Sequence, residues 1–262
     1  MDRVNRRRFL GFAGASGISL AAITGCVMPR SGAEQPDLNT TKPTTIPTAV
    51  AAVANAAATT APAPPPAIAD PRSSELALQA LIEGNTRYVE QKLSHPNQSL
   101  SRLTEVAAGQ KPFAAILGCA DSRVPPEIVF DRGLGDLFVV RGAGNFTDDV
   151  ALGSLEFAVA VLGVSVIMVL GHERCGAVAA AVQGGTAIGH IAGLIHAIRP
   201  AVERTQGMEG DPVENAVNAN VQIVVENLKN TGPILAEAVA SGSLKIVGGR
   251  YDLDSGMVQI IA

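Results

Sequence analysis

Three continuous apolar runs, with no alternation of apolar and polar positions, mark the centre of this chain. They cover residues 113–119 (FAAILGC), 137–143 (LFVVRGA) and 164–172 (VSVIMVLGH), and each is short enough to be a single strand. Strands that are buried on both faces, as in parallel sheets, have this pattern. We therefore predict three buried strands.

Apolar residues at helical spacing precede and separate these runs. Leu78, Ile82 and Val89 predict a helix that begins near Asp70 and Pro71 and continues to about residue 92. Further helices are predicted over residues 102–108, 148–163, 175–185 and 215–228. A helix between two strands implies that the strands pair in parallel.

Two further β-rich runs follow near the end of the chain, within residues 243–261, and are joined through DLDSG at residues 252–256. They predict a late strand with a hairpin return. The predicted fold class is α/β, a mostly parallel sheet flanked by helices and preceded by an N-terminal helical arm. Ligands of such open sheets bind beyond the carboxyl ends of the strands. Cys119 and His172 end two of the predicted strands, so we expect the functional site there.

Residues 1–30 have the pattern of a targeting segment. Arg6 and Arg7, followed by Phe9 and Leu10, resemble a twin-arginine export signal. The apolar run after them, residues 11–25, is too short and too rich in small side chains to span ~30 Å of hydrocarbon. We therefore predict an exported protein without a permanent membrane-spanning helix here.

Cys26 follows Ile23, Thr24 and Gly25, a pattern that resembles a bacterial lipoprotein box. The resemblance implies that Cys26 is acylated and becomes the first residue of the mature protein. The alternative is ordinary signal-peptide cleavage with Cys26 discarded or incidental. Under the first interpretation the protein lies in the periplasm or on the outer face of the cytoplasmic membrane, held by lipid.

Composition then divides the chain. Residues 31–70 are rich in Pro, Ala and Thr and have too few bulky side chains to offset the entropy of ordering, so they are predicted to be a disordered tether that reaches on the order of 35 Å. Residues 71–262 are predicted to be one catalytic domain. With no Trp and 3% aromatic residues its core must be aliphatic, and a net charge of −4 gives no indication of a nucleic-acid partner.

The chemistry lies in two motifs, GCADSRVPPE at residues 118–127 and GHERCG at residues 171–176. In an extended segment Cys119, Asp121 and Arg123 point to the same side. With Cys26 lipidated, Cys119 and Cys175 remain and could form a disulfide. Together with His172, however, they make a Cys₂His set, which suits catalytic zinc with one position free. Asp121 can either bind that metal and close the site or pair with Arg123 and leave it free.

The two motifs together resemble the β-class carbonic anhydrases, and the similarity extends over essentially all of residues 71–262. The resemblance implies an enzyme for reversible CO₂ hydration with one Zn²⁺ per chain, held by Cys119, His172 and Cys175. It also implies that Asp121 and Arg123 form a dyad that gates the fourth position, with Asp121 a ligand in the closed state only. A hydroxide formed on the zinc would attack CO₂, and activity should rise with pH above neutrality because thiolates leave the bound water less acidic.

Other positions are carried over singly from this resemblance. Gln110 matches a residue that contacts substrate from the neighbouring subunit, and Phe157 stands where the plant-like branch often has Tyr. Phe138, Ala143 and Gly176 match positions that line the pocket. The partner role of Gln110 implies a homodimer or a higher even oligomer.

One departure from the family pattern concerns regulation. Ile116 occupies the position of a Trp that, with an Arg matched here by Arg141, builds a noncatalytic bicarbonate pocket in the allosteric branch. We therefore expect no bicarbonate switch, and Arg141 could equally be an ion-pair partner at the edge of the core. We predict that His190 and His196 are not proton shuttles.

Two other functions remain open at this point. A related zinc hydrolase acting on carbonyl sulfide or carbon disulfide would keep the fold and the metal. A noncatalytic, zinc-stabilised binding protein tethered to the membrane would use Asp121 as a permanent fourth ligand, with Arg123 only balancing charge. Loss of metal from an Asp121→Ala variant would indicate the structural site.

Overall fold

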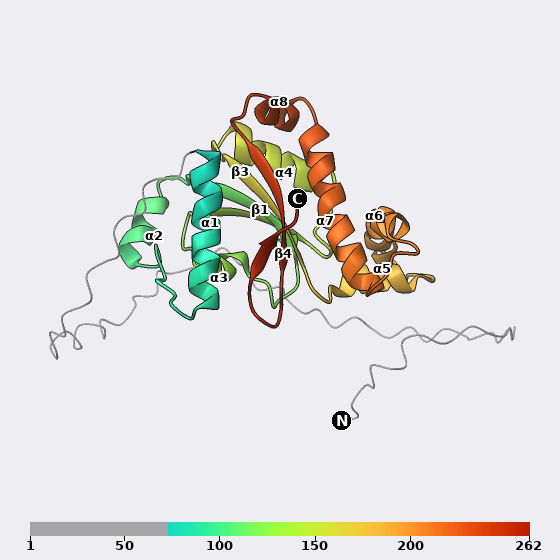
Figure 1. Ribbon diagram of the computed structural model, residues 1–262. Helices are drawn as coiled ribbons and strands as arrows, with labels where there is room; N and C mark the ends of the chain where they lie inside the picture. Colours follow the sequence, from blue (N-terminus) through green and yellow to red (C-terminus); the bar gives the residue numbers. More distant parts are fainter. Residues whose placement is uncertain (1–72) are drawn as a thin grey trace, which may run out of the picture. The chain divides into compact units, whose positions relative to one another are not determined.

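A five-stranded sheet lies at the centre of the computed structural model, which describes residues 73–262 (Figure 1). The strand order is β2-β1-β3-β4-β5. The strands are β1 (Ala114–Cys119), β2 (Leu137–Gly142), β3 (Val166–His172), β4 (Lys245–Tyr251) and β5 (Val258–Ile260). The first four pair in parallel, and β5 returns antiparallel to β4.

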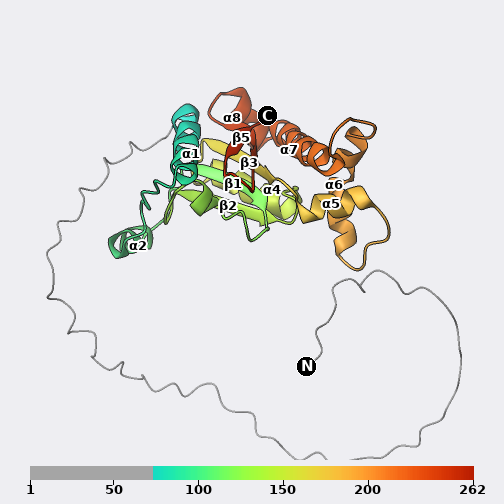
Figure 2. The same cartoon turned by 60° about the horizontal axis from the view of Figure 1, so that its bottom comes forward.

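Four of the eight helices in the described residues begin with a side chain that accepts from a backbone N–H group of the first turn. They are α1 (Ser74–Val89), α2 (Leu100–Val106), α3 (Pro126–Val129), α4 (Asp149–Ala160), α5 (Gly176–Gln183), α6 (Ile191–Arg204), α7 (Pro212–Asn230) and α8 (Ile234–Ala240). Ser73 accepts from the N–H of Leu76, and Asp211 accepts from two N–H groups at the start of α7. Such caps fix where α1 and α7 start. The strands lie between these two helices (Figure 2), with α7 packed on one core and α1 on the other.

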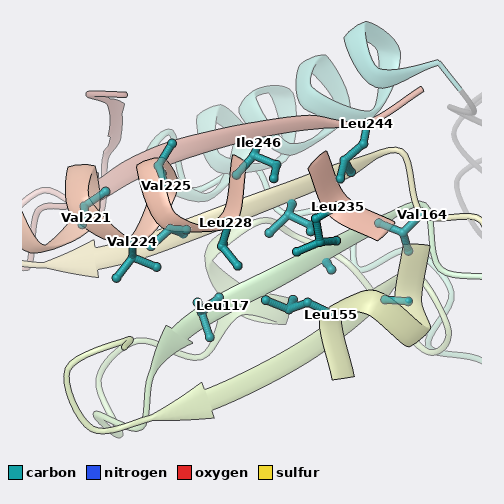
Figure 3. Packing of buried hydrophobic residues seen from close by; sticks show 14 residues of the cluster. Leu117, Leu155, Val164, Val221, Val224, Val225, Leu228, Leu235, Leu244 and Ile246 are labelled. Atoms are coloured by element: carbon teal, nitrogen blue, oxygen red, sulfur yellow. The ribbon is translucent and has the colours of Figure 1, made fainter. Parts of the chain in front are cut away.

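Alternate residues of the central strands point to two different cores. Leu117 of β1 and Ile246 of β4 face α7, α8 and α4, and Figure 3 shows these side chains meeting Leu228 and Leu155. Ile116 faces the opposite core, which α1 and α3 cover. Burial on both faces explains why β1 and β3 have continuous apolar sequences.

Two glycines let α7 approach the sheet beside the end of β3. A Cβ atom on Gly171 would lie 2.4 Å from Cγ2 of Val221, and one on Gly248 would lie 2.5 Å from Cγ1 of the same side chain. Neither distance is compatible with a real side chain without displacement of α7. The residue immediately before His172 is therefore held closely between the sheet and a long helix.

The predicted α/β fold is confirmed, including the late strand and its hairpin return. Three details differ. The strand β2 is only partly buried, because it lies at the edge of the sheet. The short helices α3 and α8 have too few residues for a periodic pattern, and α6 contains Gly193 and Pro200, which obscured its periodicity. The first helix begins at Ser74 and ends at Val89, inside the predicted limits.

The predictions for residues 1–30 and 31–70, including the export signal, Cys26 and the tether, lie outside the described residues. Within residues 73–262, no helix combines the length and apolarity needed to cross a bilayer.

Candidate metal centre

Cys119, His172 and Cys175 come together at the carboxyl ends of two neighbouring parallel strands. Cys119 is the last residue of β1 and His172 the last of β3, while Cys175 directly precedes α5. One ligand atom from each, two sulfurs and an imidazole nitrogen, lie within 4.8 Å of one another, and all three residues are buried. The sequence motifs thus meet where the fold class predicts a site.

A tight turn carries the second and third residues of this set. We call residues 172–175 the ligand turn. Its third residue, Arg174, has φ +49°, in the left-handed region that non-glycine residues seldom adopt. This conformation reverses the chain between His172 and Cys175, and the two side chains therefore face the same point although they belong to a strand end and a helix start.

The imidazole of His172 is oriented by the backbone of the next residue. Its Nδ1 lies 2.8 Å from the carbonyl oxygen of Glu173, which can only accept, so Nδ1 carries the hydrogen. Nε2 is buried and makes no hydrogen bond of good geometry with any of the described residues. A bare, buried imidazole nitrogen whose partner nitrogen donates to a carbonyl is the arrangement that metal-ligating histidines adopt.

The two cysteines form a coupled pair of free thiols whose sulfurs are 4.0 Å apart. Donation from the Cys175 thiol lowers the pKa of Cys119 to about 4 against the effect of burial, with His172 and the N–H of Gly144 helping. The pKa of Cys175 rises in turn because its thiol donates to the Cys119 thiolate and because it is buried. Burial disfavours the charged form of His172, but the Cys119 thiolate, the Glu173 carbonyl and the Asp121 carboxylate together raise its pKa. The pocket therefore favours a thiolate at Cys119.

Asp121 is held by Arg123 in a two-pronged ion pair. Nε of Arg123 lies 2.9 Å from Oδ1 and Nη2 lies 2.8 Å from Oδ2, and the backbone N–H of Arg123 also donates to Oδ1. This guanidinium keeps the pKa of Asp121 well below its usual range. The Oδ2 atom lies 3.8 Å from Nε2 of His172. The carboxylate therefore stays beside the three predicted ligands while Arg123 engages both of its oxygens.

Arg141 has a role that the sequence did not indicate. Its Nε donates to the carbonyl of Cys119 at 2.9 Å, and its Nη2 donates to the carbonyls of Asp121 at 2.7 Å and Val124 at 3.2 Å. One side chain on β2 thus fixes the backbone that carries both Cys119 and Asp121. In the sequence, Arg141 stands out only as a single charged residue near the end of an apolar strand. Its role could not be predicted, because its three hydrogen-bond acceptors are backbone carbonyls, which no sequence motif specifies.

A second support holds the sulfur of Cys119. The backbone N–H of Gly144 lies 3.2 Å from Sγ, and the carbonyl of Gly144 accepts from the buried amide of Asn220 on α7 at 2.9 Å. Hydrogen bonds of this kind orient a thiolate and lower its basicity. Asn220 was not predicted, because a polar residue in an amphipathic helix carries no signal of what it faces.

The predicted substrate residues are distributed over three places. Gln110 is exposed on the connection between α2 and β1, so about 17 Å of strand separates it from Cys119. Phe157 on α4 is half exposed, and its ring centroid lies 6.5 Å from that of Phe138 on β2. Ala143 follows β2, and a Cβ on Gly176, at the start of α5, would meet no atom within 4 Å. Their roles with substrate stay predictions.

Two cavities lie outside the set of three predicted ligands. One of about 460 Å³ is lined by residues around 132–137, and one of about 180 Å³ lies between β2 and α4, where Arg141 reaches its wall. His190 and His196 are exposed, at the start of α6 and on it. Neither of these two cavities has Cys119, His172 or Cys175 among its lining residues.

The residues present fit zinc. Two buried free thiols, an imidazole nitrogen without a hydrogen and a neutral total charge once both thiolates face Zn²⁺ are what a Cys₂His site requires. The mostly parallel sheet, with such a donor set where two of its strands end, thus has a candidate metal site where α/β enzymes bind their ligands.

Comparison with known proteins identifies the family. The family model for carbonic anhydrase matches residues 114–258. The chain is 46% identical over 186 residues to carbonic anhydrase 2 of Mycobacterium tuberculosis, covering 69% of this chain and 89% of the relative. It is 37% identical over 195 residues to the carbonic anhydrase of Mycolicibacterium smegmatis, covering 72% and 95%.

Solved structures agree. A tetrameric β-carbonic anhydrase of Sordaria macrospora has a TM-score of 0.58 at 25% identity, covering 71% of this chain and 96% of that one. The Coccomyxa β-carbonic anhydrase in complex with acetazolamide has a TM-score of 0.57 at 29% identity, covering 70% and 86%. The chain belongs to the β-class carbonic anhydrase family, and its enzyme class is carbonic anhydrase.

From the candidate metal centre we predict that the purified protein binds one equivalent of zinc per chain. Replacing His172 by Gln should reduce zinc affinity by more than the ~10 to 100-fold typical of outer-shell partners, because a ligand itself is lost. Zinc content after dialysis, measured by elemental mass spectrometry, checks this. His196→Gln, at an exposed histidine, is the matched control. Equal zinc contents in the two variants would show that His172 is not a zinc ligand.

Proposed function

We propose that this protein hydrates CO₂ reversibly to bicarbonate and a proton at a zinc ion held by Cys119, His172 and Cys175. The observation that carries the proposal is the buried set of these three side chains beside a carboxylate that Arg123 engages. When bound, zinc lowers the pKa of a water ligand and so supplies a nucleophile near neutral pH. The relatives described above are all named carbonic anhydrases, which favours CO₂ over carbonyl sulfide or carbon disulfide.

Asp121 and Arg123 would control access to the fourth position. With both carboxylate oxygens bound to Arg123, Asp121 stays ionised next to the ligands and leaves the position to a small molecule. The separation of 3.8 Å between Oδ2 and His172 Nε2 is short enough that a small rotation, with Arg123 released, would bring Asp121 into the ligand set. The same side chain can thereby hold the site ready or close it.

The surroundings suit an apolar substrate. Cys119 and Cys175 belong to a buried apolar cluster with Val178, Ile198 and Val217, contributed by α5, α6 and α7. Such walls exclude water and interact weakly with a charged product. Apolar walls of this kind would favour a small neutral molecule such as CO₂ over the charged bicarbonate product.

CO₂ hydration by the zinc-loaded protein should rise with pH between 6.5 and 9. Asp121 cannot cause this rise, because its lowered pKa keeps it ionised throughout the interval. The rise instead follows ionisation of the attacking water, which thiolate ligands leave less acidic than three imidazoles would. Stopped-flow assays over pH check this, and a flat profile or no turnover would contradict it.

Replacing Asp121 by Ala should lower turnover at least about tenfold, on the scale of a lost acid–base or orienting group, while zinc is retained. Glu209→Gln, at an exposed acidic residue between α6 and α7, is the control. Loss of zinc from Asp121→Ala would favour a permanently ligated, structural site. Hydrolysis of carbonyl sulfide or carbon disulfide without CO₂ turnover would favour the related hydrolase.

We further propose an even homo-oligomer in which one subunit completes the site of another. The Sordaria relative is described as tetrameric. In this chain β2 is a partly exposed edge strand, and α4 beside it exposes Val150, Phe157 and Val161. Gln110 precedes β1, and the length of that strand separates it from Cys119, so contact with substrate would require Gln110 of the partner subunit.

Charges on α4 should separate the subunits without unfolding them. Val150→Glu lies in the first turn of α4 and Val161→Lys at its end, where the helix dipole favours those charges. Light scattering after size exclusion should show a smaller particle and CO₂ assays a lower activity. Ile188→Glu, an exposed apolar position outside α4, is the control. An unchanged particle mass in both α4 variants would exclude this surface as the interface.

Export and lipid attachment through Cys26 complete the proposal. The arginine pair at residues 6 and 7 and the box before Cys26 support it, and so do thiolate ligands, since a route that carries folded proteins delivers them with metal already protecting the thiols.

In a bacterium with a twin-arginine pathway, the full chain should fractionate with membranes and incorporate labelled palmitate. Cys26→Ser should abolish the label and release the protein from the membrane, because the anchor is lost. Replacing both Arg6 and Arg7 by Lys should leave the uncleaved precursor in the cytoplasm, because the export signal is lost. A wild-type chain that takes up no label would contradict lipidation.

A further inference from the structure

The ligand turn is attached to β4 and to the turn after it, although these segments lie far apart in the sequence. His172 is the register partner of Tyr251, and the N–H of Glu173 donates to the carbonyl of Tyr251 at 3.0 Å. This extends the pairing of β3 with β4 one residue beyond the strand. The backbone of Glu173 is thereby fixed on its amide side.

The side chain of Glu173 is fixed as well. Its Oε1 accepts from Nη2 of Arg250 at 2.6 Å, and its Oε2 accepts from the backbone N–H of Leu253 at 3.0 Å. Arg250 in turn donates through Nε to the carboxylate of Glu214 on α7. Both side chains of the Glu173 and Arg250 pair are more than four-fifths buried. The ligand turn and α7 are therefore both tied to β4 through one guanidinium, that of Arg250.

The carbonyl of this same residue is the acceptor of His172 Nδ1. Because the amide and the carboxylate of Glu173 are both anchored, that carbonyl cannot turn away without breaking a charged, largely buried contact. The direction of Nε2, the metal-facing nitrogen, depends on it.

We propose that Glu173 is a positioning residue for the metal centre: through Arg250 and Leu253 it holds the carbonyl that selects the tautomer and direction of His172. Glu173 does not touch the metal or the substrate. Glu214 acts one step further out, by orienting Arg250. The inference rests on the zinc site of the proposed function.

Two neighbouring features do not share this role. Arg174 makes a bidentate pair with Asp254 at 2.9 and 2.8 Å, but both side chains are more than half exposed, and such pairs contribute little. Glu173, Asp252 and Asp254 also come close enough together to suggest a cation site. Arginines and backbone N–H groups already engage all three carboxylates, so we assign them no metal.

The test compares Glu173→Gln and Glu173→Ala with Asp254→Asn in the full chain. Zinc affinity, from competition with a chromophoric chelator, should fall ~10 to 100-fold in Glu173→Ala and less in Glu173→Gln, which keeps one acceptor. Asp254→Asn should stay within about twofold of the wild type, since its ion pair is exposed. Arg250→Lys should resemble Glu173→Gln, because an ammonium cannot bridge two carboxylates as a guanidinium does.

The second measurement is the visible spectrum of the Co²⁺ derivative. A displaced imidazole should change the position and intensity of the ligand-field bands in the Glu173 variants and not in Asp254→Asn. A merely structural Glu173 would lower the temperature of unfolding while leaving affinity and spectrum unchanged, and that result would overturn the inference. If Glu173→Ala does not fold, Glu173→Gln decides in the same way. A wild-type chain that binds no zinc would instead refute the proposed function itself.

Discussion

The parallel pairing of β1 with β3 is the constraint on which the metal centre depends. It brings the last residues of two strands, Cys119 and His172, to the same edge of the sheet, although 53 positions separate them in the chain. Apolar side chains on both faces fix that pairing, because a slip by one residue would turn each of them to the wrong core. The register of a hydrophobic sheet thus sets the geometry of a polar site.

Beyond this edge of the sheet, two arginines hold the following loop segments in place through hydrogen bonds and ion pairs. Arg141 binds three backbone carbonyls after β1, and Arg250 binds carboxylates from the ligand turn and from α7. A guanidinium suits both tasks, since it stays charged and presents several donors in one plane. The backbone on each side of the metal centre is therefore held by a side chain from a neighbouring strand, β2 on one side and β4 on the other.

The sequence predicted the fold class, the central strands and the three residues that meet, because each has a local signal. Continuous apolar runs mark buried strands, and Cys and His at strand ends mark a site. The supporting contacts of Arg141, Gly144, Asn220 and Glu173 had no such signal, because they involve backbone atoms brought close only by folding. The edge position of β2 was also hidden, since an edge strand that packs on one helix is nearly as apolar as a central one.

Two ion pairs of the same chemistry differ in what their surroundings allow. Arg123 is half exposed, so water can replace Asp121 as its partner, and in the proposed gate the carboxylate can leave it at small cost. Arg250 and Glu173 are both largely buried, and separating them would leave charges without partners in a region poor in water. Solvent exposure therefore distinguishes a pair that can switch from a pair that can only hold, and each pair has a carboxylate within two residues of a predicted ligand.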